Sequence, residues 1–68
     1  MQHSVREIGK RYAELSALRN DKKLFKADDF INFAKENTKK YSIIENGNDL
    51  LVSTWYSDEL VEAYRRTI

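Results

Sequence analysis

Few residues in this sequence are of a type that could carry catalysis. A histidine base, a thiolate nucleophile or a metal site needs His or Cys side chains, but His3 is the single histidine and cysteine is absent. His3 lies near the start of the sequence, where we expect the chain to fray. We therefore predict no catalytic residue, no metal ion and no cofactor, and we expect a protein that is not an enzyme.

Two pairs of carboxylates are the remaining candidates for acid–base chemistry. They are Asp28 with Asp29 and Glu59 with Glu62, and such pairs exchange protons with a substrate when they share a cleft. Both pairs fall in the first turn of a predicted helix, where negative charge interacts favourably with the helix dipole. We interpret them as residues that stabilise the helix starts.

Length and composition limit the classes of protein to which the chain can belong. It has 68 residues, of which 41% are hydrophobic and 34% are charged, and its net charge is +1. Because a typical domain has about 100–150 residues, we predict one compact domain over residues 1–68. No apolar run approaches the roughly 20 residues of a membrane span, so we expect no membrane partner and a cytoplasmic protein.

Periodic apolar residues predict one helix over about residues 4–19 and a second over about 27–37. Ser4 and Glu7 match the capping box at the first helix start. Gly9 inside this helix indicates either the close approach of another element or a tolerated, helix-weakening residue. The apolar face of the first helix would carry Val5, Ile8, Tyr12, Leu15 and Leu18, and that of the second Ala27, Phe30, Ile31 and Ala34.

A β-hairpin and a third helix follow. Asn46-Gly47 between two segments rich in strand-forming residues is typical of a type I′ turn, which would pair Ile43 with Leu50. A three-residue loop would shift the partners by one, so the sequence leaves the register open. Ser57 would cap the last helix. The predicted fold is α+β, in the order helix, helix, β-hairpin, helix, with the helices packed on a two-stranded antiparallel sheet because two strands alone are unstable in water.

Basic residues concentrate in the first 40 positions. They group around the connection between the first two helices and after the second helix, as Arg19, Lys22, Lys23 and Lys26, and as Lys35, Lys39 and Lys40. One interpretation is a nucleic-acid-binding patch on a winged-helix-like DNA-binding regulator, and the other is solvated surface. The near-neutral net charge and the acidic hairpin tip, with Glu45 and Asp49, favour the second interpretation.

The hairpin is apolar on both faces, which suggests an interaction surface. Tyr41, Ile43, Leu50 and Val52 form the more apolar face and should meet the helices. The opposite face would carry Ile44, Leu51 and Trp55, which we predict to contact another protein, because tryptophan is a favoured interface anchor. The sequence thus favours a small non-enzymatic binding module, a regulator or inhibitor of an unidentified protein, with a homodimer as one form of this contact and DNA binding as the alternative.

Overall fold

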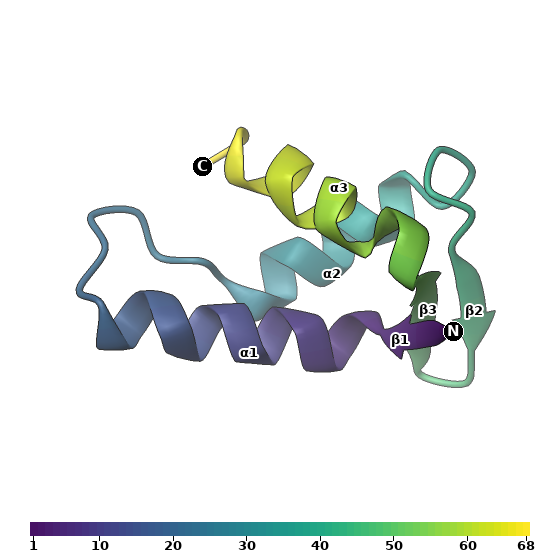
Figure 1. Ribbon diagram of the computed structural model, residues 1–68, viewed down its shortest axis with the longest axis horizontal. Coiled ribbons are helices and arrows are strands. Elements are labelled where there is room, and N and C mark those ends of the chain that lie inside the picture. Colours follow the sequence, from purple (N-terminus) through teal and green to yellow (C-terminus); the bar gives the residue numbers. More distant parts are fainter.

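The computed structural model describes residues 1–68 and shows an α+β fold, as the sequence predicts (Figure 1). The elements, in order, are β1 (Gln2–Ser4), α1 (Val5–Leu18), α2 (Ala27–Glu36), β2 (Ile44–Asn46), β3 (Asp49–Ser53) and α3 (Thr54–Arg65). The molecule is elongated, with extents of 32 × 20 × 19 Å. The sheet lies at one end, and the loop between α1 and α2 lies at the other (Figure 1). No helix has the length and apolarity that crossing a membrane requires.

The sheet has three strands, not the predicted two. All pairs are antiparallel and the order is β1-β3-β2, so β3 is central. β1 pairs Gln2 with Ser53 and Ser4 with Leu51. The segment expected to fray is therefore an edge strand. Its three residues are polar and show no alternation of apolar and polar side chains that would predict a strand. The strand forms because β3 offers it a partner.

The hairpin register differs from the predicted one by two positions. Leu50 pairs with Glu45 and not with Ile43, because the turn is centred on Gly47 and Asn48 instead of Asn46 and Gly47. Gly47 has φ +62°, whereas Asn48 does not have a positive φ. This corresponds to a type II′ turn, in which glycine takes the first central position. Because the shift is an even number, each strand residue keeps its predicted face.

The core lies between the helices and one face of β3. β3 buries Leu50 and Val52, and the alternate residues Asp49, Leu51 and Ser53 are only partly buried. The core contains twelve buried hydrophobic residues drawn from all three helices, β3 and the loops. These residues are Val5, Ile8, Phe25, Phe30, Ala34, Tyr41, Ile43, Leu50, Val52, Leu60, Val61 and Tyr64.

The contact between α1 and α2 is close at Gly9. A Cβ atom at Gly9 would lie 3.1 Å from Cδ2 of Phe30 and 3.4 Å from Cα of Ala27. The glycine therefore permits close packing, the first of the two interpretations left open by the sequence. Beyond this crossing α1 extends past α2, so Leu15 and Leu18 are 38% and 80% exposed, contrary to their predicted place in the core.

The third helix begins earlier than predicted. α3 starts at Thr54 directly after β3, with Ser53 at the N-cap position. Ser57 instead donates a hydrogen bond to the carbonyl oxygen of Thr54 within the helix. Trp55 is therefore a helical residue and not the last residue of a strand.

Candidate interaction surfaces

The predicted interaction residues lie near the sheet end of the molecule. We call Ile44, Leu51 and Trp55 the hairpin surface. Ile44 and Leu51 are direct cross-strand partners, so their side chains share one face of the sheet. That face is opposite to the one that carries Leu50 and Val52 toward the helices. Ile44 is 51% exposed and Leu51 is partly buried.

Trp55 lies apart from this strand pair. It follows the end of β3 in the first turn of α3, and its side chain is 83% exposed. The preceding residue, Thr54, donates its backbone N–H to the carbonyl oxygen of Met1 at 2.9 Å, which attaches this turn to the β1 side of the sheet. The structure thus brings two of the three predicted residues into direct contact range and places the third beyond the end of the sheet.

A hydrogen-bond network centred on Asp49 fixes the hairpin against the start of α1. The Asp49 carboxylate accepts hydrogen bonds from the Ser4 hydroxyl, from the backbone N–H of Arg6 at 3.1 Å and from that of Leu50 at 2.7 Å. The Arg6 guanidinium donates to the carbonyl oxygen of Asn48 at 2.8 Å. The start of α1 therefore binds the hairpin tip through the backbone carbonyl of Asn48 and through the side chain of Asp49.

This network lowers the pKa of Asp49 below its ordinary value of 3.8. Partial burial by itself would raise the pKa, because it disfavours the charged carboxylate. The hydrogen bonds from Ser4, Leu50 and Arg6, together with the positive charge of Arg6, outweigh that effect. Asp49 is thus a structural anion that also caps α1, and the sequence alone did not single it out.

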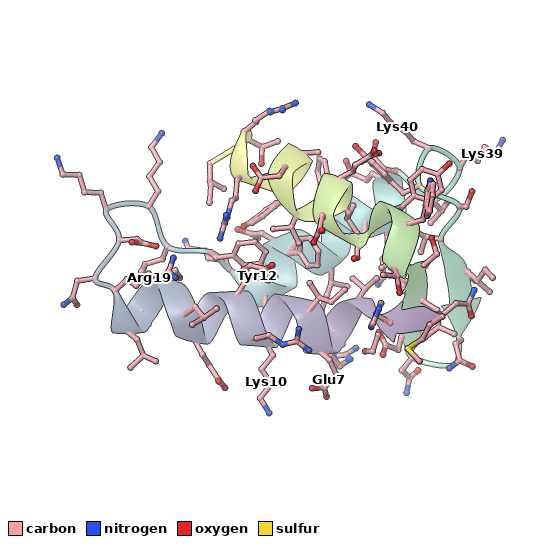
Figure 2. All side chains as sticks on the ribbon, viewed as in Figure 1. Glu7, Lys10, Tyr12, Arg19, Lys39 and Lys40 are labelled. Carbon is pink, nitrogen blue, oxygen red and sulfur yellow. The ribbon has the colours of Figure 1, made fainter.

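The predicted basic residues form two separated groups and not one patch. Figure 2 shows Arg19 at the end of α1, far from Lys39 and Lys40 near the sheet end. Lys35 lies in the last turn of α2 and lines an open groove with Arg6, Glu45 and Asp49. The ammonium group of Lys40 lies 5.7 Å from the centre of the Tyr41 ring. The basic residues therefore do not form one continuous patch.

The remaining basic residues surround two exposed leucines at the other end of the molecule. We call Leu18, Arg19, Lys22, Lys23, Leu24 and Lys26 the loop tip. Leu18 is 80% exposed and Leu24 is 49% exposed. A groove of about 360 Å³ lies beside the loop tip, lined by Ser16, Arg19, Asp21, Lys23, Phe25, Arg65 and Ile68. The sequence singled out the basic residues here but assigned Leu18 to the apolar face of the first helix.

His3 is the one histidine, and the structure places it beside hydroxyl groups. Its Nε2 lies 2.7 Å from Oγ1 of Thr54, and a groove of about 210 Å³ is lined by His3, Ser57 and Asp58 among others. The Thr54 hydroxyl also lies 3.2 Å from the carbonyl oxygen of Met1. The contact fastens β1 to α3.

No group of three or more His, Cys, Asp or Glu side chains is placed to hold a metal ion. Comparison with known proteins finds no matching family model, no similar curated protein and no similar solved structure.

Proposed function

We propose that this chain is a small non-enzymatic binding module of the cytoplasm that regulates another protein by direct contact through the hairpin surface. The observation that carries the proposal is the exposure of Trp55, whose side chain is 83% accessible in a chain with one tryptophan. A tryptophan ring that the fold leaves in water is available to a partner and would bury a large apolar area on binding. Tryptophan is also enriched among the residues that dominate interface energies.

The fold does not use the Trp55 ring for its own packing. Close aromatic pairs join Tyr12, Phe25, Phe30, Phe33 and Tyr64 in one cluster and Tyr41 with Tyr56 in a second. Trp55 takes part in neither group. Ile44, which is also more than half exposed, lies on an edge strand of three residues. β2 pairs with β3, and the network around Asp49 fixes the first residues of β3 against α1. A support that is already ordered lowers the entropic cost of binding a partner.

DNA binding through a winged-helix-like surface remains the second hypothesis, and the geometry favours it less. The two basic groups lie at opposite ends of the molecule (Figure 2). Asp28, Asp29 and Glu36 are exposed on α2, the helix that would have to enter the DNA groove. Carboxylates at these positions would repel phosphates.

The test compares the wild-type chain with Trp55→Ser and Ile44→Ser. Each immobilised chain is exposed to host lysate with and without nuclease treatment, and each free chain is examined by sedimentation velocity for self-association. We expect a protein partner, or a second copy, that is bound by the wild type and lost in both variants. The control is Lys10→Ser, which changes an exposed residue of α1 away from the hairpin surface (Figure 2).

Two results would overturn this proposal. One is a monomeric chain whose captured proteins are the same for the wild type and Trp55→Ser. The other is capture that disappears with nuclease, which would favour the DNA-binding hypothesis. Circular dichroism of each variant shows whether the fold is retained, and we expect retention because both side chains are more than half exposed.

A further inference from the structure

The loop tip combines exposed leucines with a backbone that is fixed. Asn20 has φ +54°, its N–H donates to the carbonyl oxygen of Ala17, and the N–H of Asp21 donates to that of Ser16. These two bonds form a Schellman motif, which ends α1 in a defined conformation. The buried hydroxyl of Ser16 then accepts the backbone N–H of Phe25 at 3.0 Å, which fixes the far side of the loop.

Because the loop is fixed at both sides, Leu18 and Leu24 are held in water by the fold. Leu18 occupies the last position of α1, beyond the reach of α2, and Leu24 directly precedes the buried Phe25. Both leucines are therefore available to apolar side chains of a partner.

Positively charged residues lie close to these leucines in the sequence. Residues 18–26 contain four cationic side chains and one carboxylate, Asp21. The end of α3 adds Arg65 to the neighbouring groove, where the ammonium group of Lys23 donates to the carbonyl oxygen of Ile68 at 3.0 Å. Arg65 lies 5.1 Å from the centre of the Tyr12 ring and forms an ion pair with Glu62 at 3.4 Å.

We propose that the loop tip is a second docking site, which binds an acidic amphipathic segment of a partner protein. The segment's apolar side chains would cover Leu18 and Leu24, and its carboxylates would face Arg19, Lys22 and Lys23. Charge complementarity selects the sign of the partner, and the leucines require that it also present apolar side chains. This inference rests on the proposed function, because it specifies a further protein contact of the same module.

The form of the surface favours a peptide over the other anionic partners. A nucleic acid would satisfy the cations but would leave both leucines without an apolar partner. A lipid bilayer is broad, whereas the groove beside the loop tip is a recess of about 360 Å³ that holds Asp21 and Arg65 together. A recess of this size accepts individual side chains, and its mixed charge suits a protein segment.

The experiment uses a fluorescent synthetic helical peptide of leucine, alanine and glutamate, with leucine on one face. Binding to the full chain is followed by fluorescence anisotropy. We expect micromolar affinity that weakens as salt is raised, and a loss of about tenfold or more with Leu18→Ser or Leu24→Ser. The double variant with Lys22→Gln and Lys23→Gln should lose affinity similarly, and its affinity should depend less steeply on salt.

Matched probes and variants separate the contributions. A peptide with glutamine in place of glutamate, and another with alanine in place of leucine, should both bind weakly. Lys39→Gln is the charge control, since Lys39 lies away from the loop tip (Figure 2), and it should bind like the wild type. Backbone amide shifts measured by NMR should change in residues 18–26.

Three results would overturn the inference. They are an absence of peptide binding, peptide binding that is indifferent to the loop-tip variants, and tighter binding of phosphatidylserine vesicles or duplex DNA through the same residues. If the peptide fails while capture of a partner still depends on Trp55, only the loop-tip assignment is wrong. If capture never depends on Trp55, the proposed function fails independently of the peptide result.

Discussion

The Asp49 carboxylate accepts the backbone N–H of Arg6 at 3.1 Å, although the two residues are 43 positions apart in the sequence. Asp49 opens β3, and Arg6 lies in the first turn of α1. The first N–H groups of a helix have no partner within the helix, so a carboxylate from the hairpin satisfies one of them. Ser4, the N-cap residue, satisfies another by accepting the N–H of Glu7 at 3.1 Å. Hydrogen bonds to Asp49 therefore attach the hairpin to the first turn of α1.

Replacement of Asp49 by Asn should destabilise the fold by about 1 kcal/mol near neutral pH, since it removes a charged cap. The lowered pKa of Asp49 means that its ionised form is favoured in the folded state. Its contribution is therefore present above the ordinary value of 3.8 and lost as the pH falls through the lower folded pKa. The difference in melting temperature between the wild type and Asp49→Asn should be constant from about pH 7 to about pH 5 and shrink below about pH 4.

Asp21→Asn is the control for this titration, because Asp21 is exposed and uses only its backbone in the loop. Its free energy of unfolding near neutral pH should stay within about 0.5 kcal/mol of that of the wild type. A difference between wild type and Asp49→Asn that persists unchanged at acid pH would contradict the role assigned to the Asp49 charge.

Ser16→Ala should destabilise the chain by about 1–3 kcal/mol, because it leaves the buried N–H of Phe25 without an acceptor. Ser16 is 6% exposed, and its hydroxyl also donates to the carbonyl oxygen of Ala13 at 3.0 Å. Urea denaturation measures the free energy of unfolding. Ser57→Ala is the matched control, since Ser57 also donates to a helix carbonyl but its oxygen accepts no buried N–H; a similar loss in both variants would contradict this account.

Gly9→Val should destabilise the fold by about 1–3 kcal/mol through overpacking. The contact at 3.1 Å involves Phe30, which is fully buried and packed against Phe25 and Tyr64, so the ring has little freedom to move. Ala17→Val on the exposed side of α1 introduces the same β-branched side chain and should cost less than about 1 kcal/mol. Equal thermal stabilities of the two variants would show that the α1–α2 contact is not close at Gly9.

Gly47→Ala should cost about 1 kcal/mol, because an L-residue is strained at φ +62°. No atom lies within 4 Å of the position that a Cβ would take, so the cost comes from the backbone alone. A chemically synthesised chain with D-alanine at this position favours positive φ and should match or exceed the wild type in melting temperature. If the D- and L-alanine chains melt together, the turn assignment is wrong.

The sequence predicted which residues share a face of the hairpin, because side chains alternate between the two faces and a register shift of two positions leaves the alternation unchanged. Ile43 and Leu50 are buried and Ile44 is exposed, as expected, even though the register is two positions from the predicted one. The turn type was wrong because Asn-Gly fits a type I′ turn and Gly-Asn fits a type II′ turn, and both pairs occur in Asn46-Gly47-Asn48. The turn preferences of these residues do not distinguish the two turn types. The hydrogen bonds that fix Asp49 against α1 favour the observed type II′ turn.

The remaining differences reflect tertiary contacts. Helical periodicity places Leu15 and Leu18 on the apolar face of α1, but it does not state where the neighbouring helix ends. β1 exists because the exposed edge of β3 accepts three polar residues. Trp55 has a high strand propensity, yet the chain turns into α3 at Thr54, where the hydrogen bonds to Met1 and His3 lie. Each of these features depends on residues distant in the sequence.

The fluorescence of Trp55 reports whether a partner covers its ring. It is the single tryptophan, and its exposure predicts a long-wavelength emission typical of an indole in water. The measurement is a titration of the chain with the purified partner captured in the Trp55-dependent experiment, or with the chain itself if it dimerises, corrected for the partner's own emission. The account predicts a shift to shorter wavelength that saturates with complex formation and weakens in Ile44→Ser. Complex formation that leaves the emission unchanged would show that Trp55 stays in water, and it would contradict the hairpin surface as the interface.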